Sequence, residues 1–176
     1  MTTPIRVLLE TPHGNIEVAV DHERAPITAA NFLHYVDEGF YNGGRFHRTV
    51  TPDNQPDNAI RIEVIQGGVN PDRRDECNPP IPLERTTVTG LAHRDGTISM
   101  ARFAPDSAVS DIFICIGDQP ELDFGGQRNP DGQGFAAFGQ VLAGMDVVRT
   151  IQQQPATGQT LTPPIPITRA QRIALL

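Results

Sequence analysis

The sequence predicts a mainly β protein whose strands form a closed antiparallel barrel. Three observations lead to this fold class. Short segments with β-type apolar patterning recur along the chain, only two segments have helical periodicity, and Gly and Pro each occur 16 times. Short strands separated by frequent turns are typical of all-β architectures. At 176 residues without internal repeats, residues 1–176 are expected to form a single domain with one sizeable core.

The chain is expected to begin with a hairpin and a helix. Residues 5–10 and 15–20 flank Thr11-Pro12-His13-Gly14, and this arrangement predicts two paired strands. A helix follows from Pro26, with Thr28 as its N-cap and Gly39 just beyond its end. The apolar stripe at helical spacing consists of Ala29, Phe32, Leu33 and Val36.

The remaining strands are predicted from short apolar runs bounded by turn residues. Strands are expected at 45–49, 60–66, 97–100, 111–116, 135–141 and 165–174, and a second helix at 145–152. Residues 69–90 are rich in Pro and Arg and predict a long surface loop. The extended segments 51–62 and 124–134 carry strong turn signals. We expect both segments to be surface loops near the mouth of the functional site, because they interrupt strands.

Composition excludes several classes of function. The net charge is −7, all 14 basic residues are Arg, and no basic run occurs, so neither nucleic acid nor an anionic membrane is an expected partner. The N-terminus lacks the charged and apolar regions of a signal peptide, and no apolar stretch reaches membrane-spanning length. A cytoplasmic monomer is therefore expected. Cys77 and Cys115 do not make a disulfide framework, and Cys115 is predicted to be a buried thiol.

The residues that most often carry catalysis do not form a recognisable motif. The five His show no paired spacing with Cys or carboxylates that would indicate a metal site. The segments His93-Arg94-Asp95 and Asp123-Phe124-Gly125 are similar to kinase fragments, but a chain without lysine cannot supply the phosphate-binding Lys. No serine lies in a nucleophile elbow. Neither a metal nor a cofactor is expected.

Four segments together indicate a family. They are Phe46-His47-Arg48, Val64-Ile65-Gln66-Gly67-Gly68, Ser99-Met100-Ala101-Arg102 and Ile112-Phe113-Ile114-Cys115. In this order the segments resemble the cyclophilins, the peptidyl-prolyl cis/trans isomerases, and the extended segments resemble a bacterial branch. The resemblance covers nearly the whole chain. It implies a closed eight-stranded antiparallel barrel capped by two helices, acting on X-Pro bonds in peptides and folding protein clients.

The resemblance also implies the roles of particular residues. Arg48 matches the catalytic residue, and its chemistry suits the reaction because a charged guanidinium can stabilise an X-Pro amide twisted out of resonance. Gln66 is expected to hold Arg48 and the substrate backbone, and Phe113 to form the floor of the proline pocket. The full set of expected substrate contacts is His47, Val64, Gln66, Ala101, Arg102, Phe113, Leu122 and Phe135, with Ile62 as a further pocket candidate.

Two acidic residues depart from the family pattern. Glu63 stands where a Phe is usual, and Asp111 stands where a Gln is common. We expect these acids to tune the site toward peptides with Lys or Arg near the proline, because carboxylates attract cationic ligands. The alternative is a module that binds proline-containing segments with little or no turnover, since acids close to Arg48 could pair with its guanidinium.

Overall fold

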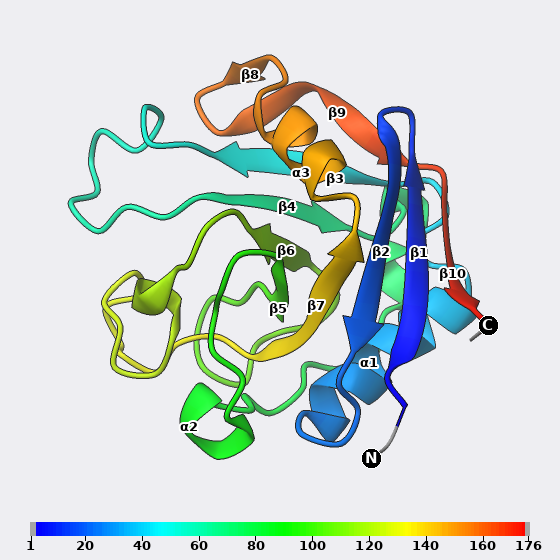
Figure 1. The fold of residues 1–176 in the computed structure, drawn as a ribbon, viewed down its shortest axis with the longest axis horizontal. Helices are drawn as coiled ribbons and strands as arrows, with labels where there is room; N and C mark the ends of the chain where they lie inside the picture. The colour runs from blue at the N-terminus through cyan, green and yellow to red at the C-terminus, as the bar shows by residue number, and fades with distance from the viewer. Residues whose placement is uncertain (1–2, 175–176) are drawn as a thin grey trace.

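One curved antiparallel sheet dominates the computed structural model, which describes residues 3–174 (Figure 1). Its strands are hydrogen-bonded in the order β10-β1-β2-β7-β5-β6-β4-β3-β9-β8. They span β1 Ile5–Thr11, β2 Gly14–Val20, β3 Gly44–Val50, β4 Val64–Gly68, β5 Thr97–Met100, β6 Ile112–Cys115, β7 Ala137–Ala143, β8 Ala156–Thr157, β9 Thr160–Ile167 and β10 Arg169–Ile173. The mainly β prediction is confirmed, and each predicted strand overlaps an observed one.

The two predicted helices lie at opposite ends of the sheet. They are α1 (Pro26–Asp37) and α3 (Met145–Gln152), seen at the bottom and top of Figure 1. The predicted 69–90 loop also contains a 3₁₀ turn, η1 (Pro71–Glu76), and a single helical turn, α2 (Thr86–Thr89); a second 3₁₀ turn, η2, spans Pro120–Leu122. Among the described residues, no helix has the length and apolar character needed to cross a membrane.

The closed eight-stranded barrel is not confirmed. Residues 3–174 form ten strands, and within this range the two ends of the strand order, β10 and β8, are not paired with each other. The predicted last strand, 165–174, is in fact two strands separated at Thr168, whose N–H donates to the Glu10 carbonyl. Sequence reasoning missed β8 and most of β9 because the Pro residues in β9 weaken the strand signal, since Pro cannot donate to a ladder.

The start of α1 differs from the prediction. The N-cap is Ala25, and Thr28 lies inside the first turn, fully buried. Both the backbone N–H and the hydroxyl of Thr28 donate to the Glu84 carboxylate at 2.6 Å. The threonine therefore links the helix to the 69–90 segment instead of capping it. The predicted end is confirmed, because Gly39 follows the C-cap with φ of +73°, the left-handed conformation that favours glycine.

Buried apolar residues form two clusters on opposite faces of the strands. The larger cluster fills the interior and includes the predicted stripe of α1 and the buried residues of β1 and β2. The smaller cluster consists of Val50, Ile62, Val64, Phe113, Cys115 and Leu122, with Ala101 and Phe135 packed against it. Side chains alternate between the faces of a strand, so Ile114 of β6 enters the large cluster while Phe113 and Cys115 enter the small one.

Candidate functional site

A groove of about 1040 Å³ lies over the smaller apolar cluster. Residues of β3, β4 and β6 form its floor, and the 101–111 and 122–135 segments form its walls. Ile62 of the first extended segment and Arg128, Asn129 and Pro130 of the second line the groove. The prediction that both extended segments lie near the site is therefore confirmed.

A β-bulge in β3 gives Arg48 its direction. The pairing of β3 with both β4 and β9 shifts register between Phe46 and Arg48. Two residues apart on a regular strand, these side chains would share a face. The extra residue, His47, instead leaves Phe46 fully buried in the large cluster while His47 and Arg48 both line the groove. Bulges next to functional sites commonly redirect side chains in this way.

Two neutral glutamines hold the Arg48 guanidinium. Its Nη1 donates to Gln66 Oε1 at 2.9 Å, and its Nε and Nη2 donate to Gln159 Oε1 at 2.9 and 2.7 Å. These bonds use three of the five guanidinium N–H groups, which leaves one on each terminal nitrogen for a ligand. Burial lowers the pKa of Arg48 from its ordinary value, and the group stays charged near neutral pH.

Asp111 fixes the orientation of Gln66. Its Oδ2 lies 3.1 Å from the donating Nε2 of Gln66 and 3.0 Å from Nε2 of His47. Because the Gln66 amide nitrogen faces this carboxylate, the amide oxygen faces Arg48. The carboxylate thus acts on the guanidinium through a neutral amide, and the structure has no ion pair between Asp111 and Arg48.

Apolar side chains form a pocket beside Arg48. Val64, Phe113, Leu122 and Ile62 are 2%, 5%, 1% and 6% exposed and line the groove. Phe135 meets Phe113 edge-to-face, with ring centroids 5.6 Å apart. This surface, which includes the suggested Ile62, has the shape and chemistry to take a small apolar ring such as that of proline.

A buried histidine supports the floor of this pocket. The ring of His93 stacks on Phe113 at 5.9 Å, and its two nitrogens lie 2.7 Å from Asp123 Oδ1 and 2.8 Å from Ser99 Oγ. The arrangement has the composition of a hydrolytic triad, but Ser99 is fully buried beneath the pocket. It therefore orients Phe113 and offers no exposed nucleophile. No sequence pattern indicated this arrangement, because its residues belong to separate loops and strands.

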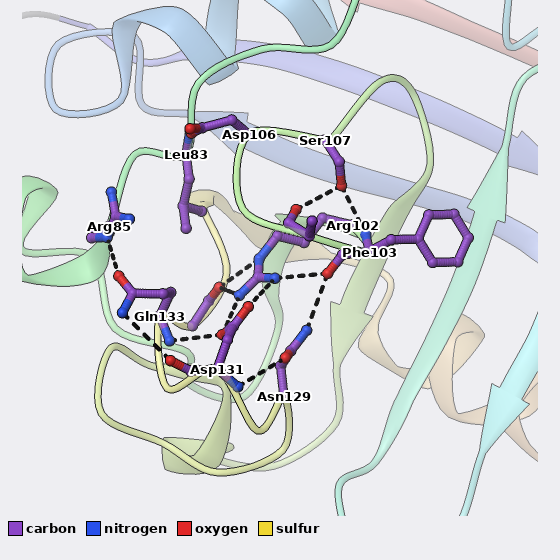
Figure 2. Close-up of polar contacts among 11 residues, drawn as sticks. Leu83, Arg85, Arg102, Phe103, Asp106, Ser107, Asn129, Asp131 and Gln133 are labelled. Atoms are coloured by element: carbon purple, nitrogen blue, oxygen red, sulfur yellow. Dashed lines mark hydrogen bonds and ion pairs between the residues drawn. The ribbon is translucent and has the colours of Figure 1, made fainter.

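Arg102 holds the groove wall together. Its side chain is 1% exposed, and its guanidinium binds both carboxylate oxygens of Asp131, at 2.9 and 3.0 Å, and the Gly134 carbonyl (Figure 2). The same group lies over the Phe135 ring, 4.8 Å from its centroid. Arg102 also lines the groove. The expectation that it positions the substrate peptide stays a prediction, and it concerns the backbone of Arg102, because the charge of the side chain is bound to the 124–134 segment.

Phe103 lies at the edge of this polar cluster. Its backbone N–H donates to Ser107, and its carbonyl accepts from Arg102 and Asn129. Its ring is 93% exposed, points away from the polar contacts in Figure 2 and lines the groove. A fixed backbone with an open aromatic ring provides apolar surface beside the pocket.

Glu63 does not reach the groove. Its Oε1 accepts a hydrogen bond from Gln152 Nε2 of α3 at 3.1 Å, and it is not among the groove-lining residues described here. The interpretation of Glu63 as an acid that tunes the site is therefore wrong. The preceding residue, Ile62, takes the place at the pocket instead.

The structure brings the other predicted residues together. Those that line the groove are His47, Arg48, Val64, Gln66, Ala101, Arg102, Asp111, Phe113, Leu122 and Phe135. Sequence reasoning missed Gln159 in the β8–β9 turn and Arg128 in the second extended segment. A glutamine or an arginine in a polar loop carries no pattern that separates it from an ordinary surface residue. Within residues 3–174, no cluster of His, Cys, Asp and Glu could hold a metal ion.

The fold and the groove define a class of protein that presents a fixed positive charge beside an apolar pocket. A family model described as cyclophilin type peptidyl-prolyl cis-trans isomerase/CLD matches residues 6–172. Peptidyl-prolyl cis-trans isomerase A of Dickeya dadantii is 41% identical over 153 residues, which cover 86% of this chain and 73% of the relative. Peptidyl-prolyl cis-trans isomerase B of Escherichia coli is 36% identical over 155 residues, covering 88% and 87%.

A solved structure supports the fold independently. The crystal structure of a cyclophilin type peptidyl-prolyl cis-trans isomerase of Cryptosporidium parvum, in the presence of the dipeptide Ala-Pro, matches with a TM-score of 0.77. The two chains are 20% identical, and the match covers 97% of this chain and 99% of the other. The chain described here belongs to the cyclophilin-type peptidyl-prolyl cis-trans isomerases, and its activity is the isomerisation of X-Pro peptide bonds.

Proposed function

We propose that Arg48 carries the electrostatic step of this isomerisation and that the groove binds proline-containing peptides and folding protein chains. The observation that carries the proposal is the Arg48 guanidinium, held by Gln66 and Gln159 with two N–H groups left over, beside a buried apolar pocket. The Ala-Pro dipeptide in the C. parvum structure supports the substrate class.

The chemistry follows from the X-Pro amide itself. Resonance gives the C–N bond double-bond character and a rotation barrier of about 18–20 kcal/mol. Rotation breaks this resonance, and the prolyl nitrogen becomes pyramidal and basic. An N–H group of Arg48 directed at that nitrogen stabilises the twisted state more than either planar state, which is the condition for catalysis. No covalent intermediate or general base is needed.

The pocket and the glutamines make this stabilisation effective. A proline ring against Val64, Phe113 and Leu122 would exclude water, and electrostatic interactions strengthen when water is excluded. Gln66 and Gln159 hold the guanidinium in place before the substrate arrives, so little reorganisation is required. The residues of the floor therefore position the ring, and Arg48 acts on the nitrogen.

The non-catalytic binding module has less support. It required an acid that pairs with Arg48 and diverts its charge. The Asp111 carboxylate instead contacts His47 and Gln66, and the Glu63 carboxylate contacts Gln152. In the described part of the chain, the side-chain acceptors of Arg48 are both neutral.

A monomer that works in the cytoplasm without a cofactor is part of the proposal. One chain supplies all of the groove residues described above, so the site does not need a second copy. Size-exclusion chromatography with light scattering at assay concentration tests this point, and a dimer would contradict it.

The experiment compares Arg48→Ala with Arg45→Ala in a protease-coupled isomerisation assay. Arg45 lies on the same strand but is exposed and outside the groove-lining set. We expect Arg48→Ala to lower kcat/KM by about a hundredfold or more, the scale of one preorganised donor, with a much smaller change in peptide affinity by calorimetry. Arg45→Ala should match the parent. Equal activity in Arg48→Ala and the parent would remove Arg48 from the mechanism.

A further inference from the structure

The groove carries positive charge in a chain that is acidic overall. The net charge of the chain is −7, yet the groove-lining residues include Arg48, Arg74, Arg102 and Arg128 and a single carboxylate, that of Asp111, within the described range. Arg102 is neutralised by Asp131. The remaining arginines make the groove a basic hollow that favours anionic over cationic ligands.

Arg128 is a half-buried member of this set, and its charge has no carboxylate partner. Its Nη1 donates to Gln55 Oε1 at 2.6 Å and to the Ile60 carbonyl at 2.7 Å, both neutral acceptors. Over residues 3–174, no ion pair joins Arg128 to an acid. Burial and the positive charge of Arg48 lower the pKa of Arg128. The second cause indicates that the two guanidinium groups lie within electrostatic reach of each other.

Arg128 also has free donors in a suitable geometry. Both contacts described above use Nη1, so Nε and Nη2 remain available. These two nitrogens form an edge of the guanidinium that matches the two oxygens of a carboxylate. Asp111 does not fill this role in the structure: its carboxylate contacts His47 and Gln66 through Oδ2, and its ion pair is with His47.

The segment that carries Arg128 is fixed on both sides. Arg102 binds Asp131 and the Gly134 carbonyl on one side of the segment (Figure 2). Arg128 itself attaches the segment to the 51–62 loop, and its backbone N–H donates to the Glu121 carbonyl. A charge held in this way requires little ordering when a ligand binds.

We propose that Arg128 binds the carboxylate of an Asp or Glu side chain next to the proline, so that the enzyme prefers acidic X-Pro segments. The proposal rests on the proposed use of the groove by peptides. It reverses the preference for Lys or Arg that the sequence predicted from Glu63 and Asp111. The competing interpretation is that Arg128 only ties the two loops together.

The test measures kcat/KM on matched peptides with Glu, Ala or Lys immediately before or immediately after the proline. The parent should favour Glu over Ala by roughly three- to tenfold on one side of the proline, and Lys should be the poorest. The preference should weaken at high salt, because exposed parts of the interaction are screened. The absence of a Glu preference on either side would overturn the proposal.

Three variants separate specificity from structure. Arg128→Met should bring the Glu-to-Ala ratio close to one, and Arg128→Lys should retain part of it because the charge remains. Arg61→Met is the matched control: Arg61 is exposed on the 51–62 loop that Arg128 contacts and lies outside the groove-lining set, and its substitution should leave the ratio unchanged. If Arg128→Met lowers turnover of all peptides by the same factor, Arg128 is structural and the proposal fails. If the parent does not isomerise the Ala peptide, that result contradicts the proposed function of the groove and not the role of Arg128.

Discussion

Replacing Gln159 with leucine should release one edge of the Arg48 guanidinium, to which we assign the electrostatic step. Gln159 Oε1 accepts from Nε and Nη2 of Arg48 at 2.9 and 2.7 Å. Leucine has a similar size but no acceptor, so only the Gln66 contact at 2.9 Å would hold Arg48. A guanidinium held through Nη1 alone can swing about its long side chain, and it would spend less time directed at the prolyl nitrogen.

The magnitude follows from the bonds that are lost. A hydrogen bond to a charged group contributes about 1.5–3 kcal/mol, and the two bonds to Gln159 share one acceptor oxygen, so we count them as one such contribution. Since about 1.4 kcal/mol corresponds to a tenfold change in rate, kcat/KM should fall by roughly ten- to a hundredfold. Gln159 is not among the described groove-lining residues, so the loss should be in kcat more than in KM.

The assay is protease-coupled isomerisation of an Ala-Pro peptide, combined with a double-mutant cycle. If Gln159 acts through Arg48, Gln159→Leu should have almost no further effect in the Arg48→Ala background. Gln153→Leu is the matched control, because Gln153 is an exposed glutamine whose amide donates only to Gln152. Parental kinetics in Gln159→Leu would refute the reasoning and leave Gln66 as sufficient. Equal effects of Gln159→Leu in both backgrounds would show that it acts on stability or on another residue.

Three further predictions concern the groove wall and the pocket. Arg102 lowers the pKa of Asp131 below its ordinary value of 3.8, so the stabilisation is complete above that value and is lost as pH falls through the lower folded-state pKa. In urea unfolding, Asp131→Asn should be less stable than the parent at pH 7, and a gap that does not narrow at all as pH falls below 3.8 would contradict this. Glu63→Gln should leave the ratio of Lys, Ala and Glu peptide turnover unchanged, because Glu63 faces α3; a changed ratio would return Glu63 to the site. Leu122→Ala should lower the unfolding free energy by about 2–5 kcal/mol and raise KM, since Leu122 is 1% exposed in the pocket cluster; an unchanged KM would remove Leu122 from the proline pocket.

Much of the fold could be predicted because a strand has a recognisable pattern of neighbouring residues. A strand that faces a core on one side alternates apolar and polar residues, and Gly and Pro mark its ends. This residue pattern located β1, β2, β5 and β6 to within one or two residues. It failed at β9, where three prolines hide the pattern, although β9 pairs with β3 near both of its ends and Arg45 lies opposite Pro166.

Part of the site could also be predicted, because the family motifs sit on those strands. Arg48, Gln66 and Phe113 occupy neighbouring strands, and the observed register places Gln66 opposite both Arg48 and Phe113. The direction of a side chain just outside a strand was less predictable. Glu63 precedes β4 by one residue, where its carbonyl still accepts from the Ile116 N–H, and its side chain is bound by Gln152 of α3.

The sequence by itself determined all strands except β8 and most of β9, the apolar surface of the pocket and the choice of arginine as the charged group. Only the tertiary structure decided how that arginine is used. The bulge at His47 redirects Arg48, and its second partner, Gln159, lies 111 residues further along the chain. The charge of the groove depends on the same kind of long-range contact, because Arg102 is neutralised by Asp131 and Arg128 is not neutralised. Residue type and spacing reflect local geometry, whereas the pairing of charges depends on which distant segments the curved sheet brings within a few ångströms of each other.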